Sequence, residues 1–478
     1  MMKKSFLTNA ASMILVGSIL CIAPTAQAQM KIDPARGVLT MAPLLEKTTP
    51  AVVNISVSST VKAPENRFRN DEFFERFFGD RGRSPNRKSE DEPEERTRRS
   101  VGSGVIINAG KGYILTNHHV IDNADKITIT LKDGRTAEAE LVGSDPGTDV
   151  ALLKIDLPNL TDVKMMDSDT VKVGDYVIAI GNSFGIGQSV TSGIVSALGR
   201  STFSRDKYQD YIQTDAAINQ GNSGGALLNS KGELVGMNTA ILSRSGGSNG
   251  IGFAVPTNMI TNVMDQLIAY GEVRRGRIGV SIQNITPELM AAMNLKSRDG
   301  ALVGQVTEDS PAEKAGLKAG DVIVKFNGKS ILDSDDIRNA VGFVERGQRA
   351  SITYLRNGKR HTTKINVEKA PDEETDATNN DEDDTFNPAS FDAFDGASFG
   401  NIPEDIEPRG GDAGVLITKV KRGSEAWDAG LRKDDIVRAI NNKDVEDLDA
   451  FKDSVSKKKG PLFLTVQRGR AQVFIAVK

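Results

Sequence analysis

The sequence predicts a mainly β protein of about three domains, in which one larger strand-rich domain is followed by two smaller, related ones. Three observations predict this fold class. The chain has 478 residues, too many for a single hydrophobic core. Between residues 101 and 267, short β-branched runs alternate with turns rich in glycine, asparagine and aspartate, which is typical of a β-barrel or sandwich. The C-terminal half contains an internal repeat, so one strand-rich unit occurs twice.

The N-terminus has the organisation of a secretory signal. Lys3 and Lys4 precede an apolar run over residues 10–22, which is followed by Ala26-Gln27-Ala28. A basic start, a short apolar run and an A-x-A site are the three parts of a cleavable signal peptide. A membrane anchor is the alternative, but the apolar run is short for a bilayer span of roughly 20 residues. The sequence therefore predicts a signal peptide over residues 1–28, cleaved near Ala28, and an exported protein that does not require a membrane.

The composition is that of a soluble globular protein, with 38% hydrophobic and 26% charged residues. The formal net charge of −4 is small, so it indicates neither nucleic acid nor an anionic membrane as an obligatory partner. The only cysteine, Cys21, lies in the predicted signal peptide. We therefore expect neither a disulfide framework nor a thiolate metal site.

The first elements of the exported chain are a short helix, predicted from residue 42, and an alternating strand over Ala51–Val57. Asp71–Gly79 follows and has four phenylalanines within six residues, which predicts either an exposed contact surface or an intrachain core helix. The next run, residues 81–99, is dense in charged residues, serine and proline, and cannot bury enough apolar surface to order itself. We expect a flexible loop at about residues 63–100.

The segment most informative about chemistry is Gly221-Asn222-Ser223-Gly224-Gly225. A serine hydroxyl becomes a nucleophile when a base takes its proton and donors await the oxyanion. The flanking glycines permit a tight turn and leave the N–H groups of Gly221 and Ser223 uncovered. Because such clusters also form ordinary turns, the interpretation needs a histidine and a carboxylate elsewhere in the chain.

The chain has three histidines, and two of them, His118 and His119, end an apolar run that predicts a strand followed by a loop. Thirty residues later, Asp149 lies between a turn and a hydrophobic strand. Asp145, before a proline, fits the role of a turn-capping aspartate better. A buried Asp149 could orient the imidazole, and the order His, Asp, Ser is that of the chymotrypsin fold.

These segments resemble the HtrA (Deg) family of serine proteases, and most closely its periplasmic Do-type members with two PDZ domains. The resemblance covers nearly the whole exported chain, and in the family motif the catalytic histidine directly precedes a valine, which selects His119 and leaves His118 as a partly exposed neighbour. The segments that carry it are Gly102–Ile107, Thr116–Val120, Thr148–Leu152, Val177–Gly185, Thr191–Ala197, Thr214–Asn229 and Gly250–Pro256.

The resemblance implies a chymotrypsin-like, trypsin-type serine protease domain over residues 29–275, called the N-terminal domain below, with two six-stranded β-barrels. Helical spacing predicts a closing helix over residues 258–270, stopped by Gly271. The implied roles are Ser223 as nucleophile, His119 as base, Asp149 as its orienting group, and the amides of Gly221 and Ser223 as the oxyanion hole. This chemistry needs no cofactor or metal.

The loop that resembles the specificity loop of these proteases is Asn238–Leu242, and it offers small and aliphatic side chains without charge. We therefore expect cleavage after small aliphatic residues. The predicted substrate-pocket residues are Ile218, Thr239, Ala240, Ile241 and Leu242.

The internal repeat relates Ser310–Ile323 to Ser424–Val437 at an offset of 114 residues. Each copy resembles a PDZ core, which implies PDZ1 over residues 276–369 and PDZ2 over residues 387–478. PDZ domains bind an extended peptide along a strand edge and hold its carboxylate with backbone N–H groups. The implied peptide-binding residues are Arg277, Ile278, Gly279 and Val280 in PDZ1, and Gly396, Ala397, Ser398 and Phe399 in PDZ2.

PDZ2 is the more degenerate copy, because Pro311 and Gly320 of PDZ1 are replaced by Glu425 and Asp434. Two hypotheses stay open for PDZ2, namely peptide binding and a role mainly in assembly. Between the copies, residues 370–386 are strongly acidic and almost free of large apolar side chains. They predict a flexible, extended linker that lets PDZ2 move relative to PDZ1.

Together these features predict an ATP-independent serine endopeptidase that acts in the periplasm on unfolded or misfolded exported proteins. The expected partners are unfolded protein and peptide substrates, peptide C-termini at the PDZ domains, and further copies of the chain in a trimer and larger cages. The resemblance places the phenylalanine-rich segment in a regulatory loop that reaches a neighbouring subunit; this loop has no cysteine pair, so we expect no redox control. The alternatives are a chaperone of the same fold and an inactive binding module.

Overall fold

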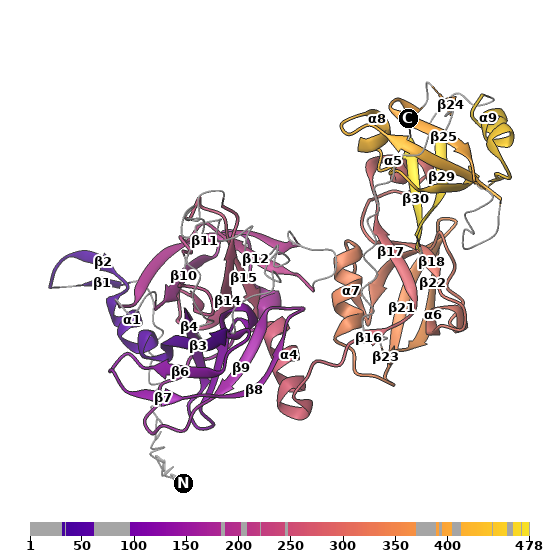
Figure 1. Cartoon of the computed structure of the whole chain (residues 1–478). Helices are drawn as coiled ribbons and strands as arrows, with labels where there is room; N and C mark the ends of the chain where they lie inside the picture. Colours follow the sequence, from indigo (N-terminus) through magenta and orange to yellow (C-terminus); the bar gives the residue numbers. More distant parts are fainter. Residues whose placement is uncertain are drawn as a thin grey trace, which may run out of the picture.

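The computed structural model describes residues 31–33, 35–61, 96–182, 187–201, 208–219, 221–243, 247–369, 389–391, 394–403, 413–441, 443–456, 462–469 and 471–477. The predicted signal peptide, the phenylalanine-rich segment and the acidic linker lie outside these residues. Figure 1 shows three bodies in chain order, the N-terminal domain, PDZ1 and PDZ2. Within the described residues, no helix combines the length and apolar character that a membrane span needs.

The N-terminal domain begins with the strand pair β1 (Lys31–Asp33) and β2 (Val38–Thr40), the predicted helix α1 (Ala42–Thr48) and the 3-10 turn η1 (Thr49–Ala51). A curled sheet of seven strands follows in the order β7-β6-β3-β4-β5-β9-β8. Its branched side chains, such as Ile55, Ile106 and Leu152, are fully buried. The strands are β3 (Val52–Val61), β4 (Arg96–Asn108), β5 (Tyr113–Thr116), β6 (Lys126–Thr130), β7 (Thr136–Glu138), β8 (Glu140–Asp145) and β9 (Val150–Lys154).

The second half of this domain is a closed barrel in the order β10-β11-β12-β15-β14-β13. Every residue of β14 and β15 is buried, so these two neighbouring strands form an enclosed part of the barrel wall. The mainly β prediction is thus confirmed, with one closed barrel and one curled half-barrel. The strands are β10 (Tyr176–Gly181), β11 (Ser189–Arg200), β12 (Tyr211–Thr214), β13 (Ala226–Asn229), β14 (Leu234–Ile241) and β15 (Gly252–Pro256), and a 3-10 turn, η2 (Ser168–Thr170), precedes β10.

The predicted closing helix is α4 (Thr257–Tyr270), which packs its apolar face against the half-barrel strands β8 and β9. Gly271 ends it with a left-handed φ of 74°, as expected for a glycine C-cap. The prediction that the histidines lie in a loop after a strand is wrong about the loop. The strand β5 ends at Thr116, and both histidines lie on a one-turn helix, α3 (His118–Ile121), because the amides of this turn donate to Asp149.

PDZ1 contains a main sheet in the order β17-β18-β19-β21-β22, with β20 beside β19, and a small pair β16-β23 that joins its two ends. Its helices lie on different sides of the sheet, and the first of them packs against PDZ2 (Figure 1). The elements are β16 (Gly276–Arg277), β17 (Val280–Asn284), α5 (Pro287–Ala292), β18 (Ala301–Val306), α6 (Pro311–Lys314), β19 (Val322–Phe326), β20 (Lys329–Ser330), α7 (Ser334–Gly342), β21 (Arg349–Arg356), β22 (Lys359–Asn366) and β23 (Glu368–Lys369).

PDZ2 repeats this architecture with a sheet in the order β24-β25-β26-β27-β29-β30, and β28 beside β27. Its elements are β24 (Ala389–Ser390), β25 (Ala397–Asn401), β26 (Val415–Val420), α8 (Glu425–Asp428), β27 (Ile436–Ile440), β28 (Lys443–Asp444), α9 (Leu448–Ser456), β29 (Leu462–Arg468) and β30 (Ala471–Val477). Both copies share a buried aspartate held by two arginine nitrogens at 2.7 Å, Asp321 with Arg356 and Asp435 with Arg468.

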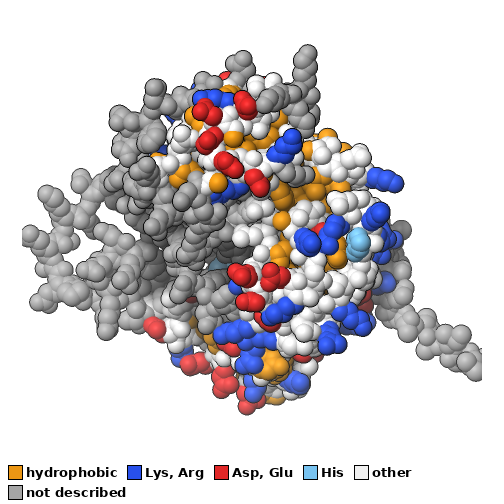
Figure 2. Space-filling model, turned by 90° about the vertical axis from the view of Figure 1, so that its right-hand side faces the viewer, with side chains coloured by type: hydrophobic (Ala, Val, Ile, Leu, Met, Phe, Trp, Pro, Cys, Tyr) orange, Lys and Arg blue, Asp and Glu red, His pale blue; other side chains and the backbone are white. Residues whose placement is uncertain are grey.

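The surface of the PDZ half carries both signs of charge. Figure 2 shows Lys and Arg side chains interspersed with Asp and Glu side chains on this face, with small hydrophobic patches between them. A mixed surface of this kind has no extended field of one sign, which agrees with the small net charge of the whole chain.

PDZ1 docks on the N-terminal domain through α7. Gly342 lies so close to the ring of Tyr208 that a Cβ would sit 2.4 Å from it. The side chain of Asn339 donates to the carbonyl oxygen of Gln209 at 2.8 Å. The guanidinium of Arg275, at the hinge between the domains, stacks over the Tyr208 ring at 3.9 Å.

The half-buried carboxyl of Asp210 lies at this junction, and its surroundings raise its pKa to about 6. Burial is the main cause, the carboxylates of Asp336, Asp169 and Asp333 add to it, and Lys329 acts in the opposite direction. The docked junction therefore favours the protonated carboxyl. Its favourable contribution is fully present below the ordinary pKa of 3.8 and is lost as the pH rises through about 6.

We predict that PDZ1 docks more loosely at about pH 7 than at about pH 5, and that Asp210→Asn removes most of this difference. The measurement is amide hydrogen exchange of α7, corrected for the intrinsic effect of pH on exchange. Asp299→Asn, a change at an exposed PDZ1 carboxylate, is the matched control and should leave the pH response intact. An unchanged pH response in Asp210→Asn would contradict the assignment.

Candidate active site

The predicted histidine and aspartate form a buried pair. Nδ1 of His119 lies 2.8 Å from Oδ2 and 3.0 Å from Oδ1 of Asp149, and the side chains are only 12% and 5% exposed. The pairing of β5 with β9, in which Thr116 faces Ala151, brings the two residues together. His119 follows β5 and Asp149 precedes β9, so the register of these two strands positions the pair.

Asp149 stands at a tight turn. Its φ of 60° is left-handed, a conformation that aspartate tolerates better than most residues. Asp145 caps the turn as expected, because its Oδ2 accepts from the amide of Thr148 at 3.0 Å and from the Thr148 hydroxyl at 2.5 Å. The guanidinium of Arg275 also donates to Asp145, at 2.5 Å. Arg275, at the hinge that leads to PDZ1, thus helps to fix the turn that carries Asp149.

The carboxylate of Asp149 is surrounded by donors. The amide of His119 donates to Oδ1 at 3.0 Å, and the hydroxyl of Thr239 donates to Oδ2 at 2.7 Å. Burial alone would raise the pKa of Asp149, but the His119 charge and the hydrogen bonds from His119 and Thr239 outweigh it and lower the pKa. Asp149 is therefore held ionised next to the imidazole.

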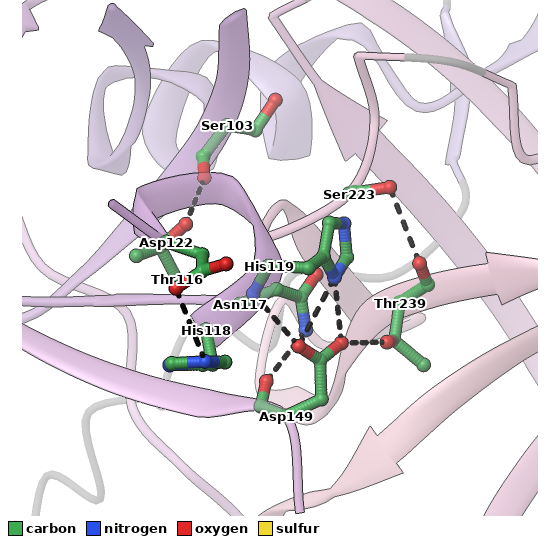
Figure 3. A network of polar contacts seen from close by, with 9 residues as sticks. All are labelled: Ser103, Thr116, Asn117, His118, His119, Asp122, Asp149, Ser223 and Thr239. Carbon is green, nitrogen blue, oxygen red and sulfur yellow. Dashed lines mark hydrogen bonds and ion pairs between the residues drawn. The ribbon is translucent and has the colours of Figure 1, made fainter. Parts of the chain in front are cut away.

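Ser223 lies in the turn between β12 and β13, on the other side of the imidazole from Asp149 (Figure 3). Its hydroxyl donates to the carbonyl oxygen of Thr239 at 3.2 Å. Thr239 thus contacts two members of the triad, with its carbonyl oxygen at Ser223 and its hydroxyl at Asp149. To bond His119, the Ser223 hydroxyl must rotate away from Thr239.

The amides of the 221–225 loop divide into two groups. Asn222, Gly224 and Gly225 donate to carbonyl oxygens at 2.8–2.9 Å. Within the described residues, no acceptor pairs with the amides of Gly221 and Ser223. Gly221 has a φ of 94°, which favours glycine. The two amides expected to hold an oxyanion are therefore the ones left without an acceptor in the part of the chain that the structure describes.

Ser103 of β4 fixes this loop, and the sequence alone did not indicate this role. Its amide donates to the carbonyl oxygen of Ser223 at 2.9 Å, and its hydroxyl donates to that of Gly221 at 2.6 Å. The same hydroxyl accepts from the amide of Asn182 at 2.7 Å. At Gly224, with a φ of 81°, a Cβ would lie 2.1 Å from the Ser103 carbonyl oxygen. Ser103 thus positions the carbonyl groups of Gly221 and Ser223, the same two residues whose amides have no acceptor within the described residues.

The predicted substrate-pocket residues are dispersed. Ile218 and Ile241 are 2% and 5% exposed and pack in the barrel core, and Ala240 is 5% exposed. Leu242 is 52% exposed. Thr239 is 1% exposed and its hydroxyl bonds to Asp149, so its side chain supports the predicted triad instead of lining a pocket.

In PDZ1 the predicted loop has the expected backbone shape. Gly279 has a φ of 77°, and a Cβ there would lie 2.3 Å from Ser310. Ile278 is buried in the PDZ1 core, Arg277 is exposed, and Val280 begins β17. Among the described strands none pairs with the outer edge of β17. This edge is open for an added strand.

In PDZ2 the corresponding glycine is Gly396, with a φ of 83° and a Cβ position 2.3 Å from Ser424. Ala397 is buried and Ser398 is half-buried on β25. The Phe399 side chain is fully buried against Phe394 and Phe451, with ring centroids at 5.1 and 4.8 Å, so it lies in the PDZ2 core. The outer edge of β25 is already paired with β24.

We predict that Thr239→Val slows the reaction of Ser223 with a fluorophosphonate probe by about one to two orders of magnitude. A hydrogen bond to a charged group contributes about 1.5–3 kcal/mol, and Val keeps the shape of Thr without the donor. The matched control is Thr239→Ser, which keeps the hydroxyl and should retain most of the rate. Equal rates for the Val and Ser variants, at unchanged thermal stability, would contradict the role of Thr239.

Comparison with known proteins agrees with this geometry. The family model "Trypsin-like peptidase domain" matches residues 102–237, and PDZ domain models match residues 276–367 and 416–468. Escherichia coli (strain K12) has two relatives that are 40% identical. The "Periplasmic serine endoprotease DegP" matches over 100% of both chains, and the "Periplasmic pH-dependent serine endoprotease DegQ" over 92% of this chain and 91% of its own.

Among solved structures, "HtrA-type protease AlgW with decapeptide" is 43% identical, with a TM-score of 0.54, over 70% of this chain and 100% of its own. A relative from Haemophilus influenzae, the "Probable periplasmic serine protease do/HhoA-like", is 43% identical over 92% of this chain and 91% of its own. The resemblance read from the sequence motifs is confirmed. The chain belongs to the HtrA/DegP family of serine endoproteases, with a trypsin-like domain followed by two PDZ domains.

Proposed function

We propose that this serine endoprotease acts through His119, Asp149 and Ser223 on unfolded or misfolded exported proteins in the periplasm, without ATP. The observation that carries the proposal is the buried His119–Asp149 pair beside a serine loop with two unpaired amides. The names of the relatives as periplasmic endoproteases support the compartment. The quality-control role follows from the resemblance to the family.

The chemistry proposed for the site proceeds in two steps. Ser223 Oγ attacks a peptide carbonyl carbon while His119 takes its proton, and His119 then protonates the leaving amine as the acyl-enzyme forms. Water, activated by His119, hydrolyses the acyl-enzyme. Asp149 stabilises the imidazolium, and the amides of Gly221 and Ser223 bind the oxyanion, each contributing about 3 kcal/mol to the lowering of the barrier.

The bond from Ser223 to the Thr239 carbonyl marks a resting position of the nucleophile. A substrate that binds along this part of β14 displaces the hydroxyl toward His119, so binding and activation of the serine are coupled. Hydrogen bonds of this kind are often formed only when the substrate is bound.

PDZ1 is proposed to bind peptide C-termini, with the carboxylate at the loop of Arg277, Ile278 and Gly279 and the peptide strand on the open edge of β17. For PDZ2, the pairing of β24 with β25 favours the hypothesis of a role other than peptide binding at that edge. A trimer, and larger cages built through the PDZ domains, remain part of the proposal, and light scattering with and without an unfolded client measures this assembly.

We predict that the enzyme cleaves an unfolded client after small aliphatic residues such as Val, Ala and Ile. The segment that resembles the specificity loop, Asn238–Leu242, lies at the end of β14 and carries no charged side chain that could select Lys or Arg. Mass spectrometry of the peptide products identifies the cleaved bonds, and Ser223→Ala, in which cleavage should be lost, controls for contaminating proteases. Cleavage mainly after Lys or Arg would refute the pocket interpretation.

The second candidate function is that of a chaperone in which proteolysis is secondary. The observation in its favour is the Ser223 hydroxyl, whose hydrogen is donated to the Thr239 carbonyl oxygen at 3.2 Å, a resting position in which the folded chain can hold a client without attacking it. We predict that Ser223→Ala still prevents aggregation of a reduced, unfolded client, measured by turbidity at a stoichiometric ratio. A loss of protection together with a loss of cleavage would exclude a separate holding activity.

A further inference from the structure

The peptide groove of PDZ1 has a direction that is set by β17 and α7. At one end, Gly276 lies against the carbonyl oxygen of Val341, near the C-terminal end of α7, and this is the end of the carboxylate loop. At the other end, the side chain of Asn284 accepts from the amide of Ser334, at the start of α7. A peptide whose carboxylate lies at the loop therefore runs along β17 toward Asn284.

PDZ2 lies at this far end of the groove. A cavity of about 750 Å³ is lined there by β17 and α7 of PDZ1, by β30 of PDZ2 and by Ser201 of the N-terminal domain. The volume falls within the range of roughly 300–1,000 Å³ that is usual for ligand pockets. Figure 1 shows β30 descending from PDZ2 toward β17 and β18. All three domains thus meet at one cavity.

The contact between PDZ1 and PDZ2 combines hydrogen bonds with apolar packing. The side-chain amide of Gln283 on β17 donates to the carbonyl oxygen of Phe474 at 2.9 Å and accepts from its amide at 2.8 Å. Beside this pair, Phe474 packs with Leu289 and Leu302 of PDZ1 in a buried apolar cluster. Because Gln283 satisfies both backbone groups of Phe474, the position of β30 relative to β17 is fixed.

The lining of the cavity indicates what it accepts. Ile282, Leu289 and Phe474 offer apolar surface. Its charged groups in the described residues are already paired, Arg338 with Asp335 at 2.6 Å and Arg468 with Asp435 at 2.7 Å. An uncharged, partly aliphatic segment fits this lining, whereas a charged one would have to displace an existing ion pair.

The length of β17 decides which part of a peptide reaches the cavity. Strands rise about 3.4 Å per residue, so the five residues Val280–Asn284 pair with roughly the last four or five residues of a peptide. Residues upstream of these pass the end of β17 and meet PDZ2. The corresponding edge of PDZ2 cannot take the peptide in the same way, because β24 already pairs with β25.

We propose that PDZ2 completes the peptide site of PDZ1, by enclosing the uncharged residues that lie just upstream of a bound C-terminal segment. This inference rests on the peptide-binding role proposed for PDZ1. It assigns to PDZ2 a selection for the length and upstream chemistry of the peptide, in place of a second, independent carboxylate site.

The test compares two fluorescent peptides with the same last four residues, one of four residues and one of nine with uncharged aliphatic residues upstream. Binding to the full chain carrying Ser223→Ala is measured by anisotropy. We expect the nine-residue peptide to bind about tenfold tighter or more. A nine-residue peptide with upstream lysines should lose this advantage.

Two variants address PDZ2 directly. Ala429→Trp and Val473→Trp fill the cavity from two separate positions of PDZ2. Both should remove the advantage of the long peptide and leave the affinity of the short one unchanged. Lys452→Trp, on an exposed position of α9, is the matched control and should change neither affinity. If Ala429→Trp unfolds PDZ2, Val473→Trp decides alone.

The outcomes separate the two proposals. If the short peptide binds and the long, uncharged one binds no tighter, the role of PDZ2 is refuted while the PDZ1 site stands. The same holds if both variants weaken the two peptides equally. If neither peptide binds the unmodified PDZ domains, the peptide-binding role of PDZ1 fails, and the role of PDZ2 fails with it.

Discussion

The burial of one negative charge, the Asp149 carboxylate, is the constraint on which the rest of the N-terminal domain depends. An ionised carboxylate in a protein interior is stable only when donors surround it. Here the donors are the ring and amide of His119 and the hydroxyl of Thr239, and they come from both halves of the domain. The half-barrel supplies the histidine and the closed barrel supplies the threonine, so the site exists only when the two halves are correctly packed.

The backbone groups of the serine loop also depend on contacts between the two halves of the domain. Two of its carbonyl oxygens accept from Ser103, which lies on β4 in the other half of the domain. The loop can present two unpaired amides because its remaining polar groups are satisfied by this distant strand. Preorganised donors of this kind are the main source of electrostatic stabilisation in acyl transfer.

The sequence predicted the parts of the site that are carried by local patterns. The histidine, the aspartate and the serine could be proposed because their three motifs were taken together, and the repeat in the C-terminal half revealed two related domains. The roles of Thr239 and Ser103 could not be predicted in this way, because each acts on residues 90 or 118 positions away. The burial of Phe399 could not be predicted, because it depends on ring contacts with Phe394 and Phe451 that arise only in the folded domain. Local spacing defines a motif, but the register of distant strands decides which side chain faces it.

The pairing of β24 with β25 has a consequence for how a protein of this design stays soluble. An open strand edge that captures foreign chains also invites the same edge of a sister molecule, and such contacts lead to aggregates. In the described structure the edge of β25 is capped by the chain's own residues, and the edge of β17 is only five residues long. Short and capped edges of this kind limit the pairing of one molecule's sheets with those of another.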